Sequence, residues 1–362
     1  MKPLALISQW NPQLTPVLRA GARFCLSLGL ATAMWGTPVF AQEPDKAKAD
    51  AAVGTGPWIT SVRWVDDGEL VAAESQGLLL RAGKVHKTKA ADPSKLESLG
   101  EEESSVWAVL PVGEGRVLAS NYKGEVFLHG SGDPQKFDLT ARWIRTLEKA
   151  PTDGQVLAGT EDGKLVVLSL ADKKELKRID AHGAAIFDIA VNAAGDKLAT
   201  VAGDGSVKLW NWPSLEAAGS MSLGKEAVWA VQFSADGSKL ITGGAERRVR
   251  LWDIAKAKLI MSIAVTPDWV TSLVSIPGSS LVVAGCMNGK LVVVDYAAQL
   301  PVQQLDGPGS AVWSMALSPS AKQLAVATRK HGLAILNTDL WQAAAKATAE
   351  RAASEKPPAP KK

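Results

Sequence analysis

One short pattern recurs seven times along this chain, and the recurrence limits the possible folds more than any other feature. In each copy an aromatic residue opens a similar apolar stretch, and successive copies begin 36 to 49 residues apart. A period of this length indicates an array of similar structural units. The seven opening residues are Trp58, Trp107, Trp143, Phe187, Trp229, Trp269 and Trp313.

Each copy contains further short runs whose composition predicts β-strands. A second apolar run follows the first, then a turn, a third run and a more polar fourth run, such as residues 175–180. The third runs alternate in character or are continuously apolar, which is typical of strands buried between sheets. We expect these third strands at residues 77–83, 125–130, 164–170, 206–212, 249–254, 290–296 and 332–338.

The turn before the third run also repeats. Glycine occupies it in six copies, where a tight hairpin needs a positive φ, and Arg248 takes its place in the fifth copy. Four short strands in about 42 residues is the size of a β-propeller blade. The sequence therefore predicts an all-β fold, a seven-bladed β-propeller of four-stranded antiparallel blades over residues 57–342. The six glycines are Gly77, Gly124, Gly163, Gly205, Gly289 and Gly332.

The fourth copy, residues 181–212, resembles the WD-repeat family of seven-bladed propellers, here of an exported bacterial type. The resemblance implies a structural tetrad, a buried polar network that gives each member a hydrogen-bond partner. The fifth copy keeps Thr242 and the pair Trp252-Asp253, but it has no preceding His and carries Glu246 in place of the Asp. The other copies lack the Trp-Asp pair. The implied tetrad residues are His182, Thr200, Asp204 and Trp210.

The two ends of the chain read as segments outside the propeller. Residues 1–41 have the basic start, apolar stretch and final Val39-Phe40-Ala41 of a secretory signal peptide, which predicts a periplasmic or secreted protein. Gly29, Gly36 and Pro38 interrupt the apolar stretch, and this disfavours a membrane anchor. We expect a flexible linker at 42–56, a tail rich in Ala, Lys and Pro at 343–362, and no membrane span after cleavage.

Charge and cysteine content exclude several classes of function. The first 41 residues carry three basic and no acidic residues, so the rest of the chain has 37 of each sign and no net charge. A neutral chain lacks the positive field that drives non-specific binding to nucleic acid, which we therefore do not expect as a partner. After cleavage Cys286 is the single cysteine, so no internal disulfide forms.

Closure of the ring is open to two interpretations at this point. In the resembled family a strand from the opposite terminus completes the last blade, but residues 42–57 are a poor strand. Residues 339–349 are the alternative donor, with Trp341 packing underneath, and this is the closure we expect.

The seven opening aromatics are the candidate binding residues. Inner strands run beside the axis of a propeller, so a residue at their start recurs around one mouth of the channel. These side chains either pack between adjacent blades or line an apolar bowl. Such a bowl would stack on a planar or sugar ligand, hold a cation or anchor a partner's loop.

No arrangement in the sequence indicates catalysis. His86, His129, His182 and His331 belong to different blades, which argues against a metal site, and no cofactor motif is present. Cys286-Met287 offers soft ligands for copper(I), but a buried apolar role explains the cysteine better. Two basic turns, Arg247-Arg248 and Arg329 to His331, are either solvated or available to an acidic partner.

Two hypotheses about function follow. The first is a non-catalytic scaffold that binds a protein partner of the cell envelope through its top face and aromatic mouth. The second is a small-molecule-binding protein or enzyme that uses the Trp-lined channel. Polar residues converging below the aromatic ring would favour the second, and an aliphatic channel would favour the first.

Overall fold

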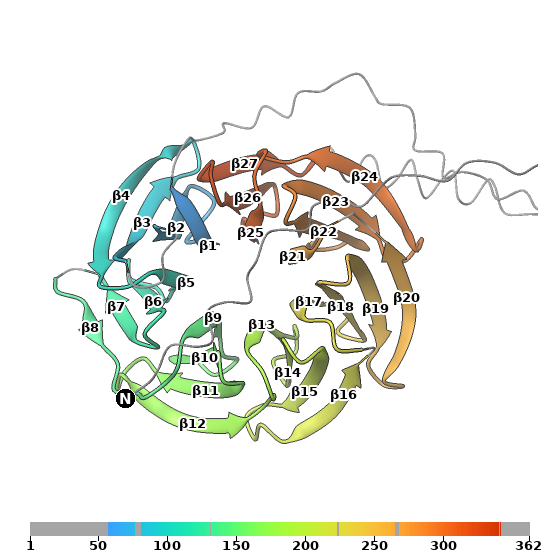
Figure 1. Ribbon diagram of the computed structural model, residues 1–362, viewed down its shortest axis with the longest axis horizontal. Helices are drawn as coiled ribbons and strands as arrows, with labels where there is room; N and C mark the ends of the chain where they lie inside the picture. Colours follow the sequence, from blue (N-terminus) through green and yellow to red (C-terminus); the bar gives the residue numbers. More distant parts are fainter. Residues whose placement is uncertain are drawn as a thin grey trace, which may run out of the picture. The chain divides into compact units, whose positions relative to one another are not determined.

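The computed structural model describes residues 57–76, 81–130, 132–222, 224–264, 268–339 and 341, and these form seven antiparallel sheets around a central axis (Figure 1). Each sheet is one blade, built from consecutive strands of the chain. The innermost strands contact one another in a closed cycle in which β1 lies between β5 and β25. The predicted seven-bladed propeller is therefore confirmed.

The first three blades have four strands each. Blade 1 contains β1 (Trp58–Trp64), β2 (Glu69–Ser75), β3 (Gly83–Lys89) and β4 (Asp92–Glu102). Blade 2 contains β5 (Val106–Pro111), β6 (Val117–Asn121), β7 (Val126–His129) and β8 (Gln135–Lys136). Blade 3 contains β9 (Ile144–Lys149), β10 (Gln155–Thr160), β11 (Lys164–Ser169) and β12 (Lys174–Asp180).

The remaining blades continue the same order. Blade 4 contains β13 (Ile186–Val191), β14 (Lys197–Ala202), β15 (Ser206–Asn211) and β16 (Ala217–Ser222). Blade 5 contains β17 (Val228–Phe233), β18 (Lys239–Gly244), β19 (Arg248–Asp253) and β20 (Lys258–Ala264). Blade 6 contains β21 (Val270–Ser275), β22 (Leu281–Cys286), β23 (Lys290–Asp295) and β24 (Leu300–Asp306). Blade 7 contains β25 (Val312–Leu317), β26 (Gln323–Thr328) and β27 (Leu333–Asn337).

The apolar cores lie between blades. Each of seven hydrophobic clusters joins side chains from two neighbouring blades, so every interface of the ring has its own core. Second strands such as β22 are buried along their whole length, because both of their faces meet a neighbouring blade, whereas the outer strand β12 has no buried residue. Burial on both faces explains the continuous apolar runs in the sequence.

The third strand of blade 1 corrects one prediction. Six of the seven expected third strands lie where the sequence placed them, but β3 covers Gly83–Lys89 and not residues 77–83. Residues 77–80 fall outside the described part of the chain. In β3 the apolar core contact comes mainly from Val85, while the buried His86 contacts Glu74 through Nε2, so the strand lacks the hydrophobic run that the other copies share.

Blade 7 has three strands within the described residues, and the prediction for its closing strand is tested only at Asp339 and Trp341. The expected closing strand at 339–349 is wrong at Asp339 and Trp341, which are helical, and its other residues lie outside the described part. Trp341 does pack as expected, 2% exposed, in the core between blades 6 and 7. Within the described residues, packing between blades 7 and 1 closes the ring, with Trp64 Nε1 donating to the Ala316 carbonyl at 2.8 Å.

The predicted signal peptide 1–41, linker 42–56 and tail 343–362 lie outside the described residues. Within the described part, no helix has the length and apolar character needed to cross a membrane.

Candidate functional site

The seven predicted aromatics occupy two register positions of the inner strands. Trp107, Phe187, Trp229 and Trp313 follow a buried aliphatic residue and lie at a β-bulge. Trp58, Trp143 and Trp269 precede that buried residue instead. The single recurring position expected from the sequence is therefore two positions. Because residues on either side of a strand residue share a face, both sets project to the same side.

In the three blades whose tryptophan precedes the buried residue, another residue occupies the bulge. Thr60 donates its hydroxyl to the Val106 carbonyl of blade 2 at 2.8 Å, and Thr271 donates to the Val312 carbonyl of blade 7 at 2.6 Å. In blade 3 the position holds Arg145, whose guanidinium lies 3.7 Å from the ring centre of Trp143 and 4.9 Å from that of Phe187. Each of these residues therefore links its blade to the next one.

The aromatic side chains contact one another, and we call the seven residues the aromatic layer. Rings on neighbouring blades have centres 4.7 to 5.6 Å apart, with Phe187 stacked on Trp229 at an interplanar angle of 6°. Trp107 and Trp313 lie on blades that are not neighbours, yet their ring centres are 6.1 Å apart. Trp229 and Trp313 also span non-neighbouring blades, at 6.4 Å. Such contacts require the rings to meet over the axis and not only in the wedges between blades.

The polar atoms of the aromatic layer are mostly unused. All seven side chains are half-buried, and five of the six indole N–H groups are buried without a hydrogen-bond partner. A buried unsatisfied donor costs free energy, so five in one cluster is an unusual concentration. The five residues are Trp58, Trp107, Trp143, Trp229 and Trp313.

Below the aromatic layer, hydrogen bonds join neighbouring inner strands at four interfaces between blades, and the sequence analysis missed them. The residue after the bulge carries an oxygen in several blades, and that oxygen accepts a backbone N–H from the next inner strand. Ser314 accepts from Val62 at 3.3 Å, and Asp188 accepts from Val231 at 3.0 Å. Ser61 and Ser272 make equivalent bonds. The shared Thr-Ser pairs at 60–61 and 271–272 are the sequence signal that could have revealed these hydrogen bonds between inner strands.

Three ionisable residues of the inner strands also influence one another's charge. Arg63, Glu148 and Asp188 come from blades 1, 3 and 4 and interact electrostatically, although no ion pair joins them in the described residues. Burial raises the pKa of Asp188 to about 7, and the charge of Glu148 adds to this effect, while Arg63 and the Val231 N–H oppose it. Burial also raises the pKa of Glu148. Leu110, Val274 and Ala316 occupy the register position of Arg63 in other blades, so the channel wall is mixed.

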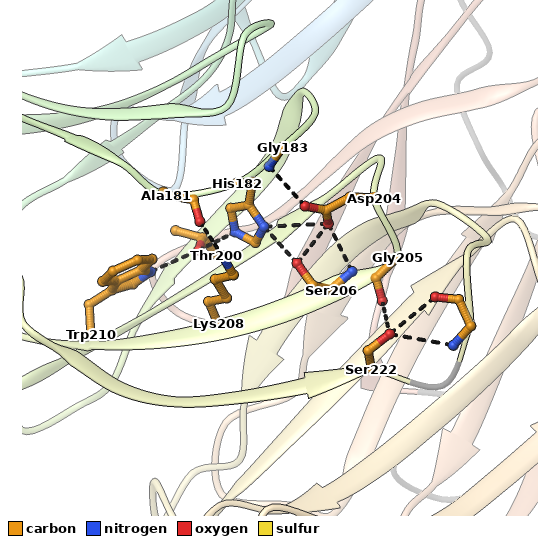
Figure 2. A network of polar contacts seen from close by, with 11 residues as sticks. Ala181, His182, Gly183, Thr200, Asp204, Gly205, Ser206, Lys208, Trp210 and Ser222 are labelled. Carbon is orange, nitrogen blue, oxygen red and sulfur yellow. Dashed lines mark hydrogen bonds and ion pairs between the residues drawn. The ribbon is translucent and has the colours of Figure 1, made fainter.

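The predicted tetrad forms in blade 4 as one continuous network (Figure 2). Trp210 Nε1 donates to Thr200 Oγ1 at 2.9 Å, and that hydroxyl contacts His182 Nε2 at 2.7 Å. His182 Nδ1 contacts Ser206 Oγ at 2.8 Å, and this hydroxyl donates to Asp204 at 2.6 Å. Burial lowers the pKa of His182 to about 4, so the imidazole is neutral at pH 7 and its 3.5 Å approach to Asp204 is not an ion pair.

Because the imidazole is neutral, the donor and the acceptor of each hydrogen bond in this network can be assigned. Trp210 donates to Thr200, Thr200 to His182 Nε2, His182 Nδ1–H to Ser206, and Ser206 to Asp204. Asp204 also accepts the Gly183 N–H at 3.0 Å. The network is fully satisfied, which assigns it a structural role.

Other blades replace the tetrad with different pairs. Blade 5 keeps the bond from Trp252 Nε1 to Thr242 at 2.9 Å and adds an ion pair between Glu246 and Arg250. In blade 2, His129 takes the register position of Trp210 and pairs with Glu102 of blade 1 at 2.7 Å. Sequence reasoning missed both pairs because their acidic partners lie on other strands or turns.

The remaining candidates stay apart. His86, His129 and His182 lie in separate networks, and the described residues hold no group of three metal ligands. Cys286 is fully buried in the core between blades 5 and 6, as its apolar interpretation predicts.

Comparison with known families agrees with this geometry. Residues 173–211 and 220–253 match the model of the WD domain, G-beta repeat. These segments run from β12 to β15 and from β16 to β19, so they contain the tetrad blade and its neighbour. No curated protein matches the chain. The fold and the two matched repeats define a seven-bladed propeller that carries WD-type repeats.

Proposed function

We propose that this propeller is a non-catalytic scaffold that binds a protein partner of the cell envelope through its top face, centred on the aromatic layer. The top face is the one that carries the starts of the inner strands. Propellers built from WD repeats commonly serve as protein-interaction scaffolds. The predicted signal peptide at 1–41 supports a periplasmic or secreted location.

One observation carries the proposal, namely the aromatic layer itself, in which ring contacts connect all seven blades and two of them, Trp107–Trp313 and Trp229–Trp313, join blades that are not neighbours. Tryptophan is enriched among the residues that dominate binding energy at protein interfaces, and a central apolar cluster is the usual position of such residues. One pocket of 410 Å³ lies away from the mouth, lined by residues such as Asp67, Lys322 and Asp339 near the junction of blades 7 and 1, whereas rings from non-neighbouring blades meet over the mouth. A platform for a partner therefore describes the mouth better than a closed ligand bowl.

The test is affinity capture from a periplasmic fraction with the full chain as bait. A triple variant, Trp107→Leu, Trp229→Leu and Trp313→Leu, keeps apolar volume but removes the indoles. We expect it to lose one specific partner while its circular dichroism stays unchanged. The matched control changes Leu176 and Ile260 to Ala, two exposed apolar residues on the outer strands β12 and β20, and retains the partner. Equal capture by the triple variant and the wild type would contradict the proposal.

A second candidate function rests on the charged group formed by Arg63, Glu148 and Asp188. Charged groups that interact without forming an ion pair among the described residues would suit a small polar ligand in the channel. A thermal-shift screen of small zwitterions against the wild type and Asp188→Asn tests this candidate. Stabilisation of the wild type that the variant loses would favour it over the scaffold.

A further inference from the structure

The basic turn of blade 7 lies directly beside the aromatic layer. Arg329 and Lys330 are exposed, and the guanidinium of Arg329 lies 5.2 Å from the ring centre of Trp58. Backbone bonds hold the turn, because the Arg329 N–H donates to the Ala311 carbonyl and the Lys330 N–H donates to Ser310 Oγ at 3.1 Å. A guanidinium stacked on a ring keeps its N–H edge free to bind a carboxylate.

Neither cation of this turn is neutralised inside the molecule. Among the described residues, Arg329 and Lys330 form no ion pair, whereas Arg145 on the other side of the layer is paired with Glu161. Asp268, the acidic residue next to Trp269, accepts that residue's backbone N–H at 2.8 Å. The mouth therefore carries a free positive charge on blade 7, and these two nearby carboxylates are already engaged.

The exposed side-chain groups of this turn are hydrogen-bond donors. A guanidinium offers five N–H groups and no acceptor, and an ammonium offers three. The Arg329 guanidinium and the Lys330 ammonium form no ion pair among the described residues, whereas five indole N–H groups of the aromatic layer are buried and closed to a partner. The ring faces of Trp58 and Trp143 are already covered by Arg329 and Arg145, which argues against a cationic ligand.

We infer that the partner binds this surface through an extended acidic segment, whose carboxylates meet Arg329 and Lys330. This inference rests on the proposed scaffold function and names the chemistry of the partner. The two cations are adjacent and exposed beside the half-buried rings of the aromatic layer, so a single small anion would engage the charge but leave the ring surface uncovered. An extended segment rises about 3.3–3.6 Å per residue, so it can reach both the cations and the rings.

Arg247 supplies a matched control for the charge on blade 7. It lies in the equivalent turn of blade 5, is exposed and is followed by another basic residue, Arg248. No ring lies under Arg247 in the described residues, and Arg248 is engaged with the carbonyl and hydroxyl of Ser262. Arg247→Glu and Arg329→Glu thus change the net charge equally but only the second removes the stacked cation.

The experiment measures binding of fluorescent peptides to the full chain by polarisation. The probes are a twelve-residue peptide of alternating Glu and Ser, the same peptide with Lys for Glu, and free glutamate as competitor. We expect the acidic peptide alone to bind, more weakly as salt rises. Arg329→Glu should weaken it by about tenfold or more and Arg329→Lys by less, because lysine keeps the charge without the planar fork, while Arg247→Glu has little effect.

Three results would overturn the inference. They are equal binding of the lysine peptide, equal effects of Arg329→Glu and Arg247→Glu, or full competition by free glutamate, which would indicate a small-anion site. Failure here is separable from failure of the scaffold proposal. If the triple tryptophan variant still loses its partner while peptides bind without charge preference, the scaffold proposal stands and the acidic partner does not.

Discussion

Replacing Thr200 with Val tests how the tetrad stabilises blade 4. The threonine is fully buried, and valine has the same shape and an equal preference for strands. The change removes one hydroxyl that serves two partners, His182 Nε2 at 2.7 Å and Trp210 Nε1 at 2.9 Å. Both partners remain buried, so each is left without a hydrogen bond.

The size of the effect follows from this count. Leaving one buried polar group unsatisfied costs about 1 to 3 kcal/mol. Thr200→Val should therefore lower the free energy of unfolding by about 2 to 6 kcal/mol. Thr242→Val in blade 5 is the internal control, because that hydroxyl serves Trp252 and no histidine, and it should cost about 1 to 3 kcal/mol.

Urea unfolding at pH 7, followed by circular dichroism and fluorescence, measures both variants. The difference between the two losses in free energy of unfolding gives the contribution of the hydrogen bond to His182. We expect Thr200→Val to be clearly the less stable variant with an unchanged dependence on urea. The reasoning is refuted if Thr242→Val is as destabilising as Thr200→Val, or if both variants unfold like the wild type.

Three further predictions concern other parts of the ring. Asp188→Asn keeps an oxygen for the Val231 N–H but removes the charge. Since the pKa of Asp188 rises from 3.8 to about 7, the folded wild type favours the protonated acid and loses stability relative to the variant as pH rises from 4 to 8, by at most about 4 kcal/mol. Thermal unfolding across that range checks the sign, and parallel curves would contradict it. Gly163→Ala should lower the melting temperature strongly, because φ is 78° and a Cβ would press on the His182 carbonyl; calorimetry that finds no loss would argue against this strain. Ser314→Ala removes the acceptor for Val62 between blades 7 and 1 and should cost about 1 kcal/mol in urea unfolding, whereas a neutral result would mean that packing alone closes the ring.

The sequence predicts the ring because its signal is repeated. Strands buried on both faces read as apolar runs, and seven such copies fix the blade number even where one copy is unclear. Blade 1 shows the limit of this signal, since β3 takes its core contact from Val85 while the buried His86 bonds to Glu74 through Nε2. A hydrophobic pattern cannot identify a strand whose buried positions are partly polar.

The candidate site is less predictable for a related reason. The recurrence places the aromatic residues at the starts of the inner strands, but it cannot separate Trp58, two residues before the bulge of its strand, from Trp107, which lies at the bulge of its own strand. The contact of Glu102 with His129 joins residues of different blades, and so does the electrostatic interaction of Arg63 with Asp188. Their chemistry arises from the closed ring and leaves no local pattern in the chain.

The most direct measurement of the binding face uses the indole N–H groups themselves. With ¹⁵N-labelled tryptophan, each indole gives its own NMR signal, and the partner recovered by affinity capture is added to the full chain. We expect the signals of the aromatic layer to shift, while those of Trp210 and Trp252, already bonded to threonine hydroxyls, do not. Unchanged signals from the layer in the presence of a bound partner would contradict this expectation.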